Sequence, residues 1–560
     1  MAPKRRDLLK AAAGLGLAGI GGASAWAARL SEGLAPGATL SGPRIDLAVD
    51  RGAWRVRGRD GSAVLANGAL PGPLLRLREG QPVRIAVHNR MREATSIHWH
   101  GLLVPSAMDG VPGLSFPGIG PGERFDYAFT PRQSGTYWYH SHSGLQEQSG
   151  LFGPLIVDPE GPDPITSDRE HVLVLSDFSF LSPRRILALL KANGEAFNYQ
   201  EQTLAGLISG HDQTLRQRLA WARMRMNPTD ISDVTGAVYT YLINGRDPEA
   251  PWTGLFRPGE RVRLRVINAS AQTIFDFRIP GLSLTVAAAD GQAVRPVTVD
   301  ELQIANAETY DLLVTPEDKA YAVVAEASDR SGLARATLAP RPGMTAPTPP
   351  LRSRPLATMR DMGMDMSGMK MGPGMPGMSM AMRDPANAPG VRMGPGVEMI
   401  APMPADRTAE PGQGLDHAGH RVLTYRDLVA LNPNPDVRSP SRSVEIHLTG
   451  NMQRFIWGLD GVSYGQKPPP YMFRAGERVR VTLVNDTMMA HPIHLHGHFF
   501  ELADGPEGFR PRKHTVNVAP AGRVSWDFTP VEGDWAFHCH MLYHMASGMF
   551  GVFAVRGGAA

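Results

Sequence analysis

The stretch Gly476-Glu-Arg-Val-Arg-Val-Thr-Leu-Val-Asn485 occurs in three related copies along the 560-residue chain. The other copies are Gly80-Gln-Pro-Val-Arg-Ile-Ala-Val-His-Asn89 and Gly259-Glu-Arg-Val-Arg-Leu-Arg-Val-Ile-Asn268. Each copy alternates Val, Ile or Leu with polar residues, which is the period of a half-buried strand. The repetition therefore indicates a triplicated β domain.

A second strand follows each copy at a similar distance. These strands read Ile97-His-Trp-His100, Ile274-Phe-Asp-Phe277 and Ile493-His-Leu-His496. Short strands separated by Gly and Pro turns predict an all-β chain of three Greek-key sandwich or barrel domains. The length agrees, because domains usually have roughly 100 to 200 residues.

We expect the first domain at residues 45–160, the second at 168–340 and the third at 421–558. Residues 180–230 carry apolar patterns typical of a helical or irregular insertion within the second domain. Residues 342–420 are rich in Pro, Gly and Met and have no apolar periodicity, so they are predicted to be a linker or disordered insertion. About half of the 26 methionines fall there.

Residues 1–30 have the features of a twin-arginine signal peptide. Arg5 and Arg6 precede a weakly apolar Ala/Gly/Leu run and a small-residue cleavage pattern. The alternative is a membrane anchor, but the run is Gly-rich and shorter than the ~20 residues that a span needs. We therefore expect the twin-arginine export machinery as a partner, a periplasmic location and no stable membrane anchor. A net charge of +3 without dense basic tracts beyond the N-terminus argues against nucleic-acid binding.

Ten of the 18 histidines lie in four short clusters. On a strand, side chains at i and i+2 share a face, so each His-x-His pair can present two imidazoles to one site. Imidazole suits copper, zinc, iron and nickel, so the histidines alone leave the metal open. The clusters are His98 and His100; His140 and His142; His491, His494 and His496; His538, His540 and His544.

Cys539 is the single cysteine and cannot form an internal disulfide. A lone cysteine is commonly a buried thiol that packs as a small apolar group. Here it lies between two clustered histidines, with His544 and Met549 downstream and His491 upstream. One thiolate, two imidazoles and a weak axial thioether form a blue-copper site. Core packing is the commoner role of a methionine, but the register of Met549 with Cys539 and His544 favours a ligand.

These motifs resemble those of multicopper oxidases over essentially the whole mature chain: His98-Trp-His-Gly101, His140-Ser-His142, His491-Pro-Ile-His-Leu-His496, and His538-Cys-His540 followed by His544 and Met549. The resemblance implies cupredoxin-like domains and four copper ions. It assigns His491, Cys539, His544 and Met549 to type 1 copper, and His98 and His494 to type 2 copper. It assigns His100, His140 and His540 to one type 3 copper and His142, His496 and His538 to the other. It also implies one-electron oxidation of a substrate coupled to four-electron reduction of dioxygen to water.

The internal repeat indicates where these sites lie. The first domain has Thr95, Ser141, Gln146 and Leu151 at the places of His491, Cys539, His544 and Met549, so it keeps imidazole pairs but no blue site. The second domain has Phe275 and Phe277 at the places of His98 and His100. We therefore expect the second domain to be a spacer and the histidine cluster to lie between the first and third domains.

Asp109 is a candidate catalytic proton donor, because related oxidases have an acid shortly after the first histidine motif. A turn residue in Asp109-Gly110 is an equally good interpretation. Many relatives also have a Glu directly after the residue that matches His544. Met545 occupies that place here and leaves the second proton donor of those enzymes in doubt.

The linker carries candidate accessory copper ligands. Thioethers prefer Cu(I), and two nearby imidazoles could hold Cu(II); a passive linker is the alternative. With the export signal, this pattern resembles periplasmic copper-resistance oxidases of the copper-resistance protein A type, which implies Cu(I) as electron donor. A laccase acting mainly on phenols and a non-catalytic copper-sequestering protein are the rival hypotheses. The candidate ligands are Met359, Met362, Met364, Met366, Met369, Met371, Met375, Met378, Met380, Met382, His417 and His420.

Overall fold

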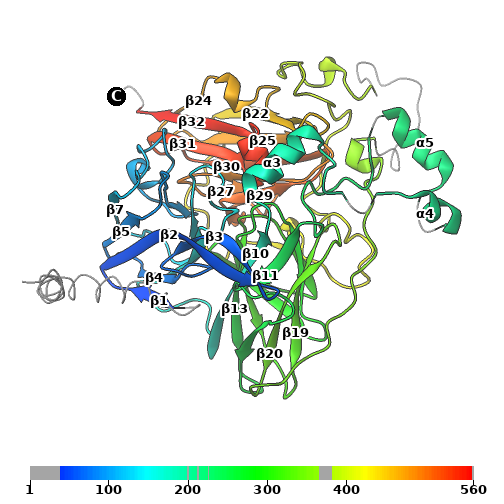
Figure 1. Ribbon diagram of the computed structural model, residues 1–560. Coiled ribbons are helices and arrows are strands. Elements are labelled where there is room, and N and C mark those ends of the chain that lie inside the picture. The colour runs from blue at the N-terminus through cyan, green and yellow to red at the C-terminus, as the bar shows by residue number, and fades with distance from the viewer. Residues whose placement is uncertain (1–37, 199–200, 211–212, 225, 365–380, 558–560) are drawn as a thin grey trace, which may run out of the picture.

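The computed structural model describes residues 38–198, 201–210, 213–224, 226–364 and 381–557. In these residues the chain forms six β-sheets arranged as three pairs, which appear in chain order from blue to red in Figure 1. The prediction of three β domains is therefore confirmed. The N-terminal segment interpreted as a signal peptide lies outside the described residues.

The first domain pairs a five-stranded sheet with a four-stranded one. Alternate residues of both sheets enclose one apolar core that includes Ile85, Trp99 and Tyr127. The five-stranded sheet has the order β1 (Thr39–Ser41), β4 (Leu74–Arg78), β9 (Phe152–Asp158), β8 (Gly135–His140), β6 (His98–His100). The other has the order β3 (Arg59–Ala66), β2 (Arg44–Val56), β5 (Val83–Asn89), β7 (Arg124–Phe129).

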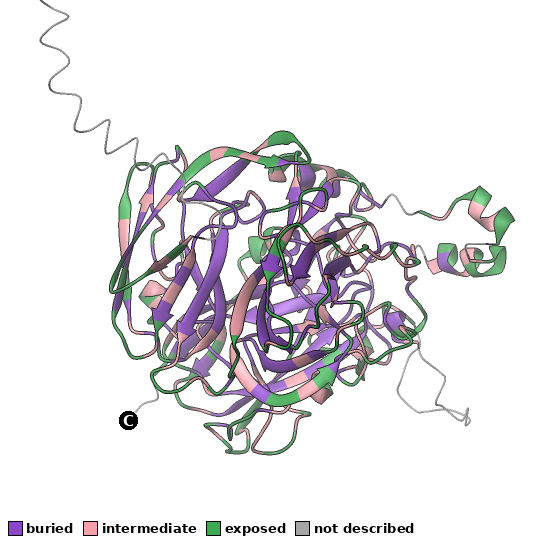
Figure 2. Cartoon of the chain, turned by 90° about the horizontal axis from the view of Figure 1, so that it is seen from below, coloured by how far each residue is buried: buried purple, intermediate pink, exposed green. Residues whose placement is uncertain are grey.

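The second domain pairs a six-stranded sheet with a five-stranded one. The first has the order β11 (Tyr239–Ile243), β10 (Arg169–Ser179), β13 (Val262–Asn268), β18 (Thr309–Val314), β15 (Leu284–Ala289), β16 (Gln292–Val299). The second has the order β12 (Trp252–Leu255), β20 (Leu333–Ala339), β19 (Tyr321–Ala327), β14 (Phe275–Arg278), β17 (Glu301–Ile304). Between β10 and β11 run the helices α3 (Pro183–Ala192), α4 (Leu204–Ser209) and α5 (Leu215–Met224). Figure 2 shows α4 and α5 at the edge of the molecule, away from the buried strands.

The third domain pairs a seven-stranded sheet with a five-stranded one. The first has the order β23 (Ile456–Leu459), β22 (Arg442–Asn451), β25 (Val479–Asn485), β30 (Gly522–Phe528), β27 (Phe500–Leu502), β28 (Arg512–Lys513), with β21 (Ala405–Asp406) also on β30. The second has the order β24 (Tyr471–Arg474), β32 (Phe550–Arg556), β31 (Gly533–Cys539), β26 (His491–Leu495), β29 (Thr515–Val518). Helix α6 (Leu542–Ala546) follows β31. The 3-10 turns are η1 (Ser106–Met108), η2 (Arg360–Met362), η3 (Pro385–Asn387), η4 (Tyr425–Asp427) and η5 (Tyr464–Gln466).

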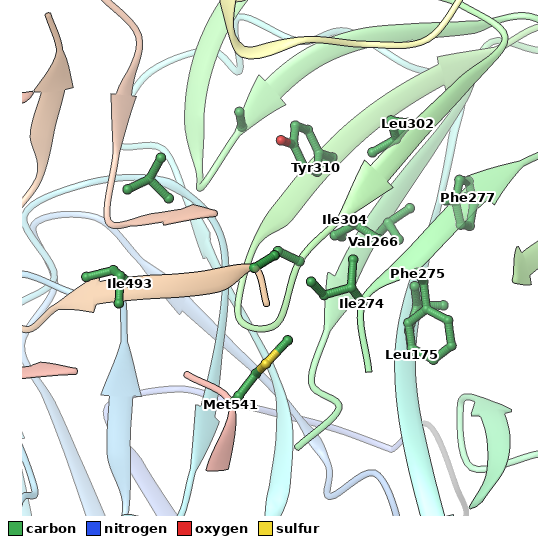
Figure 3. Close-up of a cluster of buried hydrophobic side chains, with 14 of the residues drawn as sticks. Leu175, Val266, Ile274, Phe275, Phe277, Leu302, Ile304, Tyr310, Ile493 and Met541 are labelled. Atoms are coloured by element: carbon green, nitrogen blue, oxygen red, sulfur yellow. The ribbon is translucent and has the colours of Figure 1, made fainter. Parts of the chain in front are cut away.

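One apolar cluster continues from the second domain into the third. Figure 3 shows Ile274 and Ile304 of the second domain in the same cluster as Ile493 and Met541 of the third. Because burial of apolar surface stabilises association, this continuity fixes the second domain against the third.

Parts of the Pro/Gly/Met-rich segment pack against the third domain. Met362 and Met399 are fully or almost fully buried in an apolar cluster with Met488 and with Trp221 of helix α5. Met364 and Met382 pack against the same cluster. Residues 365–380, which hold most of the remaining methionines, lie outside the described part of the chain. Within the described ranges, no helix combines the length and apolar character needed to cross a bilayer.

A buried ion-pair network joins the first and second domains. The carboxylate of Asp311 accepts hydrogen bonds from Thr136 of the first domain at 2.7 Å and from Arg263 Nε at 3.0 Å. Asp311 is 1% exposed and Arg263 is 3% exposed. Removing one member of such a pair leaves an uncompensated buried charge.

Asp311→Ala should therefore lower the free energy of unfolding by about 3–5 kcal/mol, because Arg263 loses a buried partner. The control is Asp126→Ala, which breaks an exposed pair with Arg124 and should cost at most about 1 kcal/mol. Denaturant unfolding of both variants measures the difference. Equal losses would show that the buried network contributes no more than a surface pair.

Candidate metal centre

The two histidines of β6 face a common site because the strand alternates. β6 pairs antiparallel with β8, which places His98 opposite His140 and His100 opposite Trp138. Trp99, between the two histidines, points the other way into the domain core, with its ring 5.1 Å from that of Tyr127. The i, i+2 spacing thus separates packing residues from site residues.

The third domain repeats this arrangement on β26 and β31. These strands pair antiparallel, with His494 opposite His538 and Ile493 opposite Cys539. Ile493 and Leu495 are buried in the apolar core, while His494 and His496 lie on the opposite face. Cys539 likewise lies on the opposite face of its strand from its neighbours His538 and His540.

The structure brings eight histidines together where the first domain meets the third. Their Nε2 atoms converge in pairs across the domain boundary: His142 and His538 at 3.3 Å, His140 and His540 at 3.4 Å. Within the third domain the Nε2 atoms of His496 and His538 are 2.9 Å apart. We call this set the eight-histidine cluster: His98, His100, His140, His142, His494, His496, His538 and His540.

The electrostatics of the cluster suit a metal ion. Burial, and then the charges of neighbouring histidines, hold the pKa of His140 and of His494 well below the ordinary value. Burial lowers the pKa of His538 to about 4. Neutral imidazoles keep a lone pair for a metal. The Nε2 atoms of His98 and His494 are buried and have no hydrogen-bond partner among the described residues, so the donor set fits metal ions.

The outer ring nitrogens are held by protein oxygens. His98 Nδ1 donates to the Asp109 carbonyl at 2.7 Å, and His494 Nδ1 donates to the His514 carbonyl at 2.7 Å. His538 Nδ1 donates to the carbonyl of Cys539 at 3.0 Å. Such contacts select the tautomer that presents Nε2 to a metal.

Asp109 is both a turn residue and a site residue. Gly110 has φ +83°, and a Cβ there would lie 1.9 Å from the Ile97 carbonyl oxygen, so the turn requires glycine. The Asp109 side chain is fully buried, and its Oδ2 accepts from His496 Nδ1 at 2.8 Å. Asp109 thus contacts histidines of the first and third domains.

Three side chains form a second site, the Cys539 cluster. His491 Nδ1 and His544 Nδ1 are 3.1 Å apart, and Cys539 Sγ lies 3.6 Å from the first and 3.7 Å from the second. All three residues are fully buried. Burial raises the pKa of the Cys539 thiol, so a thiolate at this position requires a cation that replaces the proton.

Polar and aromatic residues orient the two histidines of the Cys539 cluster. His491 Nε2 is 2.7 Å from Thr487 Oγ1, and His544 Nε2 is 2.6 Å from Asp233 Oδ2. The indole of Trp457 stacks on His544 with ring centroids 3.9 Å apart. Met549 is fully buried in the same apolar cluster as Cys539, and its carbonyl oxygen accepts from the Cys539 amide at 3.2 Å.

Several residues of this centre were absent from the sequence predictions. Glu147, Asp233 and Thr487 contact clustered histidines and belong to no recognised motif. The repeat could have indicated Glu147, because it follows Gln146 as Met545 follows His544. Asp233 lies just beyond the irregular insertion of the second domain, where no periodic pattern locates a residue.

The described candidate accessory ligands belong to neither the eight-histidine cluster nor the Cys539 cluster. Met359 is 38% exposed, while Met362, Met364 and Met382 belong to or pack on the methionine-containing apolar cluster. His417 is exposed, and His420 Nε2 contacts the buried Glu301 carboxylate at 2.6 Å. The other predicted methionines lie outside the described residues: Met366, Met369, Met371, Met375, Met378 and Met380.

The chain belongs to the multicopper oxidase family. Residues 48–162, 211–342 and 438–559 each match a family profile described as multicopper oxidase. Copper resistance protein A of Escherichia coli is 46% identical, over 98% of each chain. A copper resistance protein A homolog of Pseudomonas syringae pv. tomato is 47% identical, over 91% of this chain and 92% of the relative. The crystal structure of Fet3p, a multicopper oxidase that functions in iron import, has the same fold, with a TM-score of 0.65 at 18% identity over 92% of this chain and 90% of Fet3p.

Cys539→Ser should abolish the intense blue absorption and the oxidase activity, because only the Cys539 cluster loses its thiolate. The eight histidines keep their positions, so their metal content should persist. Absorption spectroscopy and copper analysis of the purified variant measure both effects. His98→Ala is the complementary variant and should keep the blue band while losing oxygen reduction. Retained blue colour in Cys539→Ser would contradict the assignment.

Proposed function

We propose that this multicopper oxidase oxidises Cu(I) to Cu(II) in the periplasm and reduces dioxygen to water, as part of copper resistance. The overall reaction is 4 Cu(I) + O2 + 4 H+ → 4 Cu(II) + 2 H2O. The observation that carries the choice of substrate is a cavity lined by methionines and carboxylates beside the Cys539 cluster.

We assign four resident copper ions to the two clusters. His491, Cys539, His544 and Met549 would hold type 1 copper, and His98 and His494 would hold type 2 copper. His100, His140 and His540 hold one type 3 copper, and His142, His496 and His538 hold the other. When bound, copper supplies a one-electron acceptor at the first cluster and the oxygen-reducing centre at the second. Cys539 is directly bonded along the chain to His538 and His540, which gives a short covalent connection between the clusters.

The cavity has a volume of about 420 Å3 and lies next to His491. Thr487 lines it, and the Thr487 hydroxyl is 2.7 Å from His491 Nε2, so one side chain separates the cavity from the cluster. Thioether sulfur is a soft ligand that prefers Cu(I) to hard cations. Four methionines line this space: Met226, Met399, Met452 and Met488.

Carboxylates in the same cavity favour a cation over a neutral substrate. Burial, and then the charges of Asp233, Glu195 and Glu398, raise the pKa of Asp230 well above its ordinary value. Asp230 is 4% exposed, and its Oδ1 has no hydrogen-bond partner among the described residues. A cation in the cavity would favour the ionised form and pair with it. The other acidic side chains that line the cavity are Glu195, Glu398 and Asp486.

Phenol oxidation is the second candidate function. A cavity of about 420 Å3 lies within the usual range for small-molecule sites, roughly 300–1,000 Å3, and would admit a single aromatic ring. The two donors differ in what they require from the lining. Cu(I) needs the thioether sulfurs, whereas a phenol needs only apolar surface.

Changing Met226 and Met452 together to Leu tests this choice, because Leu conserves volume and removes sulfur. Loss of the soft ligands should raise the KM for Cu(I) at least about tenfold, which corresponds to about 1.4 kcal/mol. The KM for a phenol should stay within a factor of about two. Met91→Leu, a buried methionine of the first domain core, is the matched control. Equal losses with both donors would exclude a Cu(I) site in the cavity.

The methionines of residues 366–380 are proposed to collect Cu(I) for this cavity. Their flanking residues Met364 and Met382 pack on the same cluster as Met488. Tethered weak sites raise the local ligand concentration. Changing Met366, Met369, Met371, Met375, Met378 and Met380 to Leu should slow Cu(I) oxidation at low copper and spare the blue spectrum. Steady-state rates of the variant and the wild-type enzyme are compared with Cu(I) and with a phenol as electron donor. Unchanged rates with both donors would show that these methionines have no role in catalysis.

We also propose a role for Asp109 and a location for the enzyme. Asp109 passes protons to the eight-histidine cluster in this proposal, which its contact with His496 Nδ1 at 2.8 Å supports. Twin-arginine export to the periplasm is supported by the sequence of residues 1–30 and by the similarity to copper resistance proteins. Dioxygen is the electron acceptor.

A further inference from the structure

We infer that Glu147 is a positioning residue that orients His140 of the first domain and His540 of the third domain toward one metal ion. This inference rests on the proposed assignment of both histidines to the same type 3 copper. The Nε2 atoms of the two rings are 3.4 Å apart and face each other. Their Nδ1 atoms lie on the outer side, where Glu147 is located.

The two carboxylate oxygens of Glu147 face the two outer nitrogens, one at hydrogen-bond distance and one farther away. Oε2 lies 2.7 Å from His140 Nδ1, and Oε1 lies 3.8 Å from His540 Nδ1. The second distance exceeds a hydrogen bond, and neither Oε1 nor His540 Nδ1 has another partner within the described residues. A small rotation of either side chain would close this contact. A carboxylate on Nδ1–H fixes the tautomer that presents Nε2 and raises the basicity of the ligand.

The residues on either side of Glu147 hold it in place. The side-chain oxygen of Gln146 accepts hydrogen bonds from the Thr95 hydroxyl at 2.7 Å and from the Ser141 hydroxyl at 2.9 Å. The Gln148 side chain donates to Asp177 Oδ1 at 3.2 Å. Glu147 itself is 3% exposed. A buried carboxylate on a fixed turn is a preorganised partner for a ligand histidine.

Asp109 gives an independent parallel. It also comes from the first domain and contacts one histidine of each domain, His98 through its carbonyl and His496 through its carboxylate. Each acid of the first domain therefore lies beside one histidine of its own domain and one of the third. In the repeat, Glu147 occupies the position of Met545 in the third domain.

The test compares Glu147→Ala, Glu147→Gln and Glu147→Asp in the copper-loaded enzyme. Two Cu(II) ions held close enough to couple magnetically would give no EPR signal. Glu147→Ala should lower the affinity of the proposed type 3 site for copper by about 10- to 100-fold. Its EPR spectrum should show a copper signal that the wild-type enzyme lacks, and its blue absorption band should be unchanged. Glu147→Gln keeps one acceptor and should give a weaker effect, and Glu147→Asp should restore most of the silent pair. If Glu147→Ala does not fold, Glu147→Gln carries the comparison.

Glu326→Gln is the matched control, because Glu326 is a fully buried carboxylate in an ion-pair network of the second domain. It should lower Tm without changing copper content or the EPR spectrum. If Glu147→Ala and Glu147→Gln only lower Tm in the same way, Glu147 is a structural acid and the inference is overturned. A wild-type enzyme without a silent copper pair would instead overturn the copper assignment, and with it the inference.

Discussion

The burial of eight imidazoles at one domain boundary is the constraint on which the rest of the structure depends. An unsatisfied buried polar group costs about 1–3 kcal/mol, and several ring nitrogens here have no partner among the described residues. A metal ion bound to these nitrogens would satisfy them. Carbonyl and carboxylate oxygens hold the outer nitrogens of several of these rings, and Asp109 contacts two of the histidines. The first and third domains supply four histidines each, so neither domain completes the cluster alone.

The second domain contributes no histidine to either cluster, as the phenylalanines on β14 indicated, yet it contacts both. Asp233 holds His544 of the Cys539 cluster. The Asp290 carboxylate accepts hydrogen bonds from the backbone amides of His514 at 3.2 Å and Thr515 at 3.1 Å. It also forms an ion pair with the buried Lys513 at 3.0 Å. The His514 carbonyl in turn accepts from His494. The domain is therefore a spacer that also fixes ligand orientation at both sites.

The first and third domains have different side chains at the same three positions of the repeat. In the third domain His491, Cys539 and His544 converge. At the same places in the first domain Thr95, Ser141 and Gln146 converge, and both hydroxyls donate to the Gln146 side-chain oxygen. A closed set of neutral hydrogen bonds satisfies these buried groups without a cation. The same backbone geometry therefore accommodates either a metal cluster or a hydrogen-bonded trio.

The sequence by itself determined the three β domains, the strands that carry the ligands and the histidine pairs, because strand periodicity and repeat spacing are local properties that one chain records directly. It did not locate Asp233 or Asp290, since each contacts a residue of another domain. Glu147 belongs to no motif, although the repeat aligns it with Met545. For Asp109 the sequence left a turn and a proton-donor role equally open, and the fold puts it in a turn with its carboxylate against His496. The methionine- and carboxylate-lined cavity likewise assembles from segments between residues 192 and 488. Contacts between distant segments depend on how domains pack, and packing is decided only by the tertiary structure.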